Sequence, residues 1–203
     1  HKGITNISTD DVAVAQELGY VIKLVGDVRE VESGISAEVS PTFLPKNHPL
    51  ASVNDVMNAV FVESIGIGES MYYGPGAGQK PTATSVLADI IRIARRLSDG
   101  NVGKPFNEFR RDLPLANPAD VKSNYYFALD TPDEKGKILH LSEIFNSEDI
   151  SFEQVLQQKA NGTTARIVVI THAMSKTQLK AVTEKLEAAE DFTVVNTLKV
   201  LSN

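Results

Sequence analysis

The stretch Tyr72-Tyr73-Gly74-Pro75-Gly76-Ala77-Gly78-Gln79-Lys80-Pro81 joins a predicted strand to a predicted helix. Its three glycines within five residues indicate a loop with unusual backbone angles or a close approach to another group. Apolar residues then recur at helical spacing from Val86 to Leu97, and Pro81 suits the first turn of a helix. Free N–H groups at such a helix start favour anionic ligands, although a tight strand-to-helix turn would need the same glycines.

The rest of the first half of the chain predicts an α+β arrangement in which strands pack on two helices. The first helix covers residues 10–18, with Ser8 or Thr9 as its cap and Gly19 after its end, and the second ends near Gly100. Strands are predicted over residues 20–28, 35–43, 56–63 and 69–73. Residues 104–120 contain three prolines and little periodicity, and we interpret them as a linker.

After residue 120 the pattern changes to the order βαββαβ. The predicted strands cover residues 125–129, 151–159, 164–171 and 192–201, and the first helix covers 134–146. The second helix begins at the capping box Ser175-Lys176-Thr177-Gln178, and Asn161-Gly162 predicts a tight hairpin between the two middle strands. This order within roughly 80 residues is typical of a ferredoxin-like domain.

Composition narrows the function classes. The 203 residues carry a net charge of −6, with 42% hydrophobic and 23% charged residues, which is ordinary for a globular protein. Without cysteine, disulfides, zinc–thiolate sites and a thiol nucleophile are excluded, and a cytoplasmic location is favoured. No basic stripe points to nucleic acid, no apolar run approaches the roughly 20 residues that span a membrane, and four scattered histidines suggest no metal site.

Several ordered motifs together resemble the homoserine dehydrogenase family. The glycine loop with its following Pro-Thr-Ala fits the segment that joins the family's substrate domain to its closing helix. The further motifs are Gly3-Ile4-Thr5, Ala15-x-x-Leu18-Gly19, Ile22-Lys23-Leu24-Val25-Gly26, His48-Pro49-Leu50-Ala51 and Asn58-Ala59-Val60. The resemblance runs through nearly the whole chain.

This resemblance implies the C-terminal part of an NAD(P)-dependent oxidoreductase that reduces aspartate semialdehyde to L-homoserine. Residues 1–103 would belong to its substrate and dimerisation domain, with Gly76, Ala77 and Gly78 approaching the cofactor. The chain lacks the Gly-x-Gly-x-x-Gly fingerprint of a Rossmann domain in its required strand–helix context. The family's proton-relay lysine and substrate-binding acids lie upstream of His1. We therefore expect no catalytic residue, no bound cofactor and no activity in this fragment alone.

Residues 121–203 resemble an ACT domain, an amino-acid-sensing module. The segment Asp130-x-x-Asp133-x-x-Gly136 carries this resemblance, although Lys135 stands where a proline is common. An effector, L-threonine by family analogy, would bind between two copies in a homodimer or tetramer. Its predicted site consists of Asp133, Lys135, Gly136 and Lys137 with the partner's strand around Ser151 and Gln154. The alternatives are a solvated turn in a domain that only dimerises, a stand-alone amino-acid-binding module, or an oligomerisation scaffold.

Overall fold

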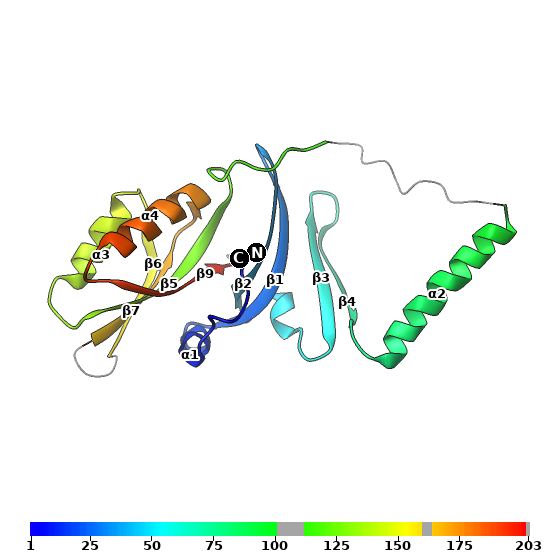
Figure 1. Cartoon of the computed structure of the whole chain (residues 1–203), viewed down its shortest axis with the longest axis horizontal. Coiled ribbons are helices and arrows are strands. Elements are labelled where there is room, and N and C mark those ends of the chain that lie inside the picture. Colours follow the sequence, from blue (N-terminus) through cyan, green and yellow to red (C-terminus); the bar gives the residue numbers. More distant parts are fainter. Residues whose placement is uncertain (101–111, 160–163, 202–203) are drawn as a thin grey trace. The chain divides into compact units, whose positions relative to one another are not determined.

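A computed structural model describes residues 1–100, 112–159 and 164–201 (Figure 1). The chain forms two compact units. The larger, which we call the sheet unit, contains His1–Lys46 and Leu113–Asn203, and the smaller, the hairpin unit, contains Asn47–Asp112.

The sheet unit is built on one long sheet with the strand order β1-β2-β9-β5-β7-β6. Its strands are β1 (Tyr20–Val31), β2 (Gly34–Pro45), β5 (Lys122–Pro132), β6 (Phe152–Lys159), β7 (Thr164–Thr171) and β9 (Thr193–Val200), and the short β8 (Met174–Ser175) pairs with β5. Its helices are α1 (Thr9–Glu17), α3 (Lys137–Asn146) and α4 (Lys176–Ala188).

Residues 122–200 confirm the predicted ferredoxin-like order. The elements follow one another as β5-α3-β6-β7-α4-β9, apart from the two-residue β8, and the four long strands lie in the order β9-β5-β7-β6 with antiparallel neighbours. The predicted capping box is present at α4, where Ser175 accepts from the Gln178 N–H and Gln178 in turn caps Ser175. The predicted Asn161-Gly162 turn lies outside the described residues.

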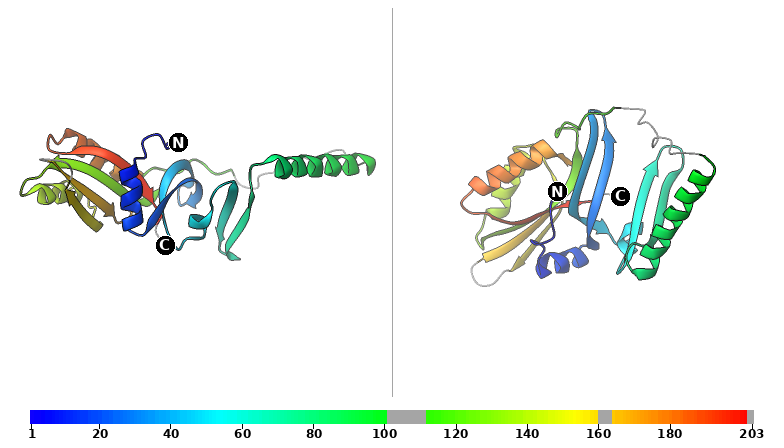
Figure 2. Two further views of the ribbon diagram at one scale, coloured as in Figure 1. Left: turned by 90° about the horizontal axis from the view of Figure 1, so that it is seen from below. Right: turned by 45° about the vertical axis from the view of Figure 1, so that its right-hand side comes forward.

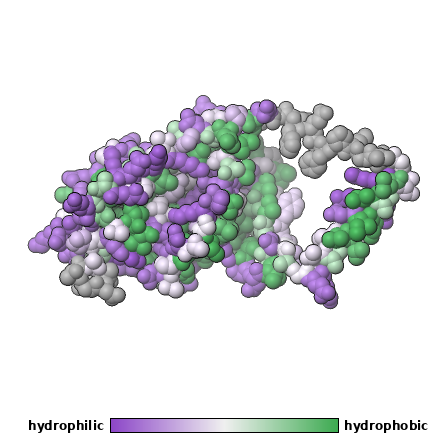
Figure 3. Space-filling model, in the orientation of Figure 1, coloured by the Kyte–Doolittle hydropathy of each residue, from purple (hydrophilic) through white to green (hydrophobic). Residues whose placement is uncertain are grey.

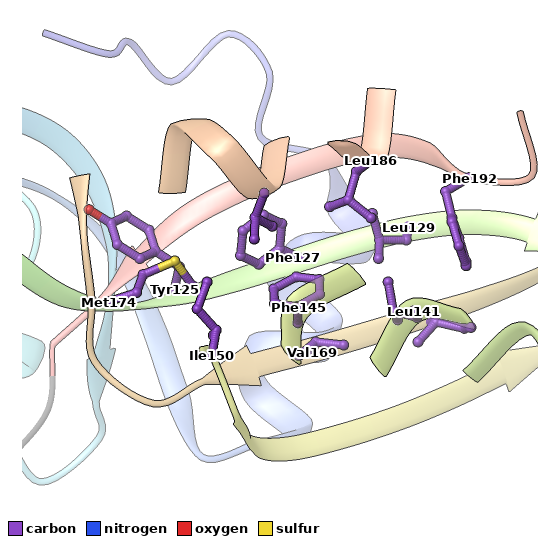
Figure 4. Close-up of a cluster of buried hydrophobic side chains, with 12 residues drawn as sticks. Tyr125, Phe127, Leu129, Leu141, Phe145, Ile150, Val169, Met174, Leu186 and Phe192 are labelled. Carbon is purple, nitrogen blue, oxygen red and sulfur yellow. The ribbon is translucent and has the colours of Figure 1, made fainter. Parts of the chain in front are cut away.

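Two apolar clusters cover the two faces of this sheet. Side chains alternate along β5, so Phe127 and Leu129 face one side while Tyr126 and Ala128 face the other. The first side packs under α3 and α4, where the rings of Phe127 and Phe145 meet edge to face at 5.2 Å (Figure 4). The second side packs against α1. Coverage on both faces explains why Tyr125 to Leu129 form an unbroken buried run.

The hairpin β1–β2 extends the sheet beyond β9. The two strands are paired along their whole length, from Tyr20 with Pro45 to Val31 with Gly34 (Figure 2). β2 then runs parallel to β9, with Thr42 opposite Lys199 and Phe43 opposite Val200. We call these four residues the β2–β9 junction. The first 46 residues therefore share a sheet with the C-terminal strands.

This division differs from the predicted domain boundaries at residues 103 and 121. Strand pairing at the β2–β9 junction and the packing of α1 on β5 attach residues 1–46 to the later part of the chain. Part of the predicted linker also has defined contacts, because the Ile35 N–H donates to the Pro114 carbonyl at 2.9 Å. Which family domain each unit corresponds to stays a prediction.

The hairpin unit consists of a short 3-10 helix η1 (Pro49–Ser52), the antiparallel pair β3 (Met57–Ser64) and β4 (Gly68–Pro75), and the helix α2 (Gln79–Ser98). None of its described residues, 47–100 and 112, is buried. The predicted packing of strands on both helices therefore holds for α1 and not for α2. Within the described parts of the whole chain, no helix has the length and apolar character needed to cross a membrane.

Candidate functional site

The glycine loop lies at the start of α2. Gly78 precedes the helix with a φ of 119°, a backbone conformation that favours glycine. A Cβ atom on Gly76 would lie 1.8 Å from Nδ2 of Asn58, so the missing side chain makes room for Asn58. Asn58 Nδ2 and the Gly76 N–H both donate to the Val56 carbonyl, at 3.3 and 3.0 Å. Gly76 thus has a packing role inside its own loop, and the cofactor contact of Gly76, Ala77 and Gly78 stays a prediction.

Polar contacts with Asp191 connect the predicted effector turn and the start of α3 to the loop before β9. Gly136 takes a left-handed conformation with φ of 92°, directly before α3, and no side chain caps that helix. The Lys137 ammonium lies 3.3 Å from Asp191 Oδ2 and 3.4 Å from Glu134 Oε2. His140 Nδ1 lies 3.0 Å from the same Asp191 oxygen. Although burial opposes it, bonding to His140 and Lys137 lowers the pKa of Asp191.

The two halves of the predicted effector site are at opposite ends of the sheet within one chain. The turn from Asp133 to Lys137 follows Pro132, which pairs with Thr164 at the start of β7. Gln154 instead pairs with Ile170, six residues further along β7. At about 3.3 Å per residue, this separates the two halves by roughly 20 Å. Ser151 and Gln154 are both exposed, and they lie near the start of β6, which is an edge strand of the sheet.

Sequence reasoning missed an ion cluster at the β2–β9 junction. Lys199 is only 6% exposed, and its ammonium donates to Asp27 of β1 and Glu38 of β2. Lys176, the first residue of α4, approaches the other oxygen of Glu38 at 2.7 Å. Burial opposes ionisation, but bonds from Lys176 and Lys199 lower the pKa of Glu38 to about 2. The sequence feature that could have indicated this ion cluster is a lysine between Leu198 and Val200 in an apolar strand.

A second buried polar group fixes α1 on the sheet. Asp11 is 2% exposed and accepts from the Tyr126 hydroxyl at 2.9 Å and from Asn196 Nδ2 at 3.0 Å. It also caps its own helix by accepting from the Ser8 N–H at 2.9 Å. Against the effect of burial, these hydrogen bonds lower the pKa of Asp11. One carboxylate thereby connects α1 with β5 and β9.

The described geometry defines a two-unit α+β protein with a ferredoxin-like sheet, and comparison with known proteins identifies its relatives. A family model described as homoserine dehydrogenase matches residues 1–91. The homoserine dehydrogenase of Lactococcus lactis is 60% identical over 202 residues, which are 100% of this chain and 47% of that protein. The Bacillus subtilis homoserine dehydrogenase is 34% identical over 191 residues, covering 93% of this chain and 44% of the relative.

A solved structure agrees with these relatives. The crystal structure of a homoserine dehydrogenase from Thiobacillus denitrificans superposes with a TM-score of 0.88 at 30% identity, over 98% of this chain and 47% of that one. The chain belongs to the homoserine dehydrogenase family. It spans slightly less than half the length of the relatives that it matches.

Proposed function

We propose that this chain is the C-terminal part of an NAD(P)-dependent homoserine dehydrogenase, which interconverts aspartate semialdehyde and L-homoserine in the cytoplasm. The 60% identity with the Lactococcus lactis relative along the whole chain carries this proposal. The family resemblance puts the dinucleotide-binding domain and the reacting groups upstream of His1. We therefore expect the 203-residue chain alone to show no NAD(P)-dependent oxidation of L-homoserine, measured by nicotinamide absorbance.

The hairpin unit would then be one portion of a substrate and dimerisation domain. Its exposed apolar side chains support this role, because soluble proteins rarely leave such large apolar surfaces uncovered. Figure 3 shows them gathered along α2. They include Val86, Leu87, Ile90, Ile91, Ile93 and Leu97, each more than half exposed. We expect the remaining half of the full-length enzyme to cover this apolar face of α2. The same contact would bring the glycine loop to the cofactor.

The part of the sheet unit formed by residues 121–203 would sense an amino acid in the manner of an ACT domain. Its βαββαβ order, the uncapped start of α3 and the exposed strand β6 support this assignment. In two copies paired antiparallel along β6, Ser151 and Gln154 of one copy would approach the end of β6 that adjoins the partner's effector turn. The roughly 20 Å separation within one chain would thereby be removed. A homodimer is thus required for this site.

The test is a thermal-unfolding titration of the chain with L-threonine, using L-serine, L-lysine and L-methionine for comparison. A ligand at about 100 times its dissociation constant should stabilise the chain by roughly 2.7 kcal/mol, which raises the unfolding midpoint measurably. We expect a saturable shift with L-threonine that requires the dimer, as checked by light scattering at the same concentrations. A flat response to all four amino acids would contradict amino-acid sensing.

Side-chain variants on β6 locate the effector site. Gln154→Ala should weaken the L-threonine response about tenfold, because a hydrogen bond to a charged ligand contributes about 1.5 kcal/mol or more. Gln157→Ala is the matched control, since Gln157 is also exposed but lies on the opposite face of the strand. Equal behaviour of the two variants would remove β6 from the site.

A further inference from the structure

β2 and β9 separate beyond their junction and leave a cleft between them. The two strands run parallel but pair only at Thr42–Phe43 with Lys199–Val200. Before those residues, Ala37–Pro41 and Val194–Leu198 form two walls of a cleft of about 650 Å³. Leu179 and Thr183 of α4 line a third side. This volume is within the range of roughly 300–1,000 Å³ that is common for small-molecule sites.

The two strand edges present hydrogen-bond acceptors to this cleft. The carbonyl oxygen of Val39 on β2 accepts from the backbone N–H of Lys2 at 2.8 Å. The carbonyl oxygen of Thr197 on β9 accepts from the ammonium group of the same Lys2. Lys2 therefore bridges the two walls, and its ammonium group occupies the Thr197 carbonyl, which is the acceptor open to a cation. The cleft is suited to a primary amine at this position.

The cleft also contains a cationic side chain that can bind a negatively charged group of the same ligand. Lys176 lines the cleft, and 32% of its side chain remains accessible while its ammonium pairs with Glu38. A carboxylate that reaches Lys176 would form a charge-assisted hydrogen bond, which is among the stronger polar contacts in proteins. Glu38 keeps Lys199 as a partner, so sharing Lys176 with a ligand does not leave a buried carboxylate unpaired.

We propose that the cleft between β2 and β9 binds a small zwitterionic amino acid within a single chain. Its ammonium group replaces that of Lys2 on the Thr197 carbonyl, and its carboxylate binds Lys176. This inference rests on the proposed amino-acid sensing but assigns a different site from the α3 turn. The ligand lies beside the β2–β9 junction, through which the hairpin β1–β2 joins the sheet. Ligand binding therefore directly affects how this hairpin is attached to the sheet.

Isothermal titration calorimetry of the 203-residue chain tests this site with the same four amino acids. Lys176→Met should weaken binding of the responding amino acid about tenfold or more, because a charge-assisted hydrogen bond is lost. Lys180→Met is the matched control on α4, since Lys180 pairs with Glu184 and does not line the cleft. Thr183→Phe, which fills the cleft without touching its charges, should weaken binding at least as much.

Ligand analogues test the recognition of both charges. N-acetyl-L-threonine lacks the ammonium group and L-threonine methyl ester lacks the carboxylate, and each should bind about tenfold more weakly than the parent if L-threonine is the responding amino acid. Unfolding midpoints of every variant establish that it is folded before titration.

The outcomes separate this inference from the proposed function. If Gln154→Ala abolishes binding while Lys176→Met and Thr183→Phe bind normally, the α3-turn site stands and the cleft proposal is overturned. If the two cleft variants lose binding and Gln154→Ala does not, the cleft is the site. If none of the four amino acids binds, both the cleft proposal and amino-acid sensing are overturned.

Discussion

Glu38→Gln should lower the free energy of unfolding by about 2–3 kcal/mol at pH 7, because it leaves the buried Lys199 with one carboxylate instead of two. The effect should depend on pH. The pKa of Glu38 is lowered from 4.5 to about 2, so its ionised form stabilises the fold above pH 4.5, and this contribution is lost as the pH falls toward 2. Urea unfolding of the variant and the native chain at pH 7 and pH 3 measures the difference.

The control for this substitution is Glu187→Gln. Glu187 is an exposed residue of α4, so its replacement should change the free energy of unfolding by less than about 0.5 kcal/mol at either pH. A Glu38→Gln effect of equal size at pH 7 and pH 3 would show that the charge of Glu38 does not stabilise the β2–β9 junction.

Gly34→Ala should destabilise the sheet unit by about 3 kcal/mol, through a strained backbone and a steric clash. Gly34 begins β2 with a φ of 141°, and a Cβ atom there would lie 2.1 Å from the Pro114 carbonyl oxygen. The neighbouring Ile35 exchanges two backbone hydrogen bonds with this segment, with Pro114 and with Ala116, each at 2.9 Å. The clash is with backbone, so relief requires that these bonds break. Urea unfolding measures the loss.

Gly26→Ala is the matched control in the same hairpin. A Cβ atom on Gly26 would meet Val39 Cγ2 at 3.9 Å, an ordinary contact, and Gly26 has no positive φ. We expect a change within about 1 kcal/mol of the native chain. If the two alanine variants were equally stable, the contact between the start of β2 and residues 114–116 would not exist in solution.

Local patterns explain why most elements were predictable. The capping box at Ser175, the apolar run of β7 and the stripe of apolar residues on α4 each act within one turn or one strand. Such patterns predict the βαββαβ order along the chain, because each helix or strand can be recognised from its own residues. The capping of α1 was predicted only in part, because Asp11 takes the role usually held by a glutamate or glutamine.

Long-range partners were not predictable from the same patterns. The composition of residues 35–43 predicts a strand, but it does not say that Thr42 pairs with Lys199 rather than with a nearer strand. Tyr126 and Asp11, which bond at 2.9 Å, are 115 residues apart. The residues of the cleft likewise come from the N-terminus, β2, β5, α4 and β9. The glycine loop was found for its composition, whereas the position of Asn58 against Gly76 required the structure.

We propose that this chain supplies the C-terminal half of a homoserine dehydrogenase. The most direct measurement uses a fusion of the N-terminal half of the Lactococcus lactis relative to His1 of this chain, at the point where the two proteins align. We predict NAD(P)-dependent oxidation of L-homoserine by the fusion, with no activity from either half alone. A folded, dimeric fusion that binds nicotinamide nucleotide yet oxidises L-homoserine no faster than the N-terminal half alone would contradict the claim.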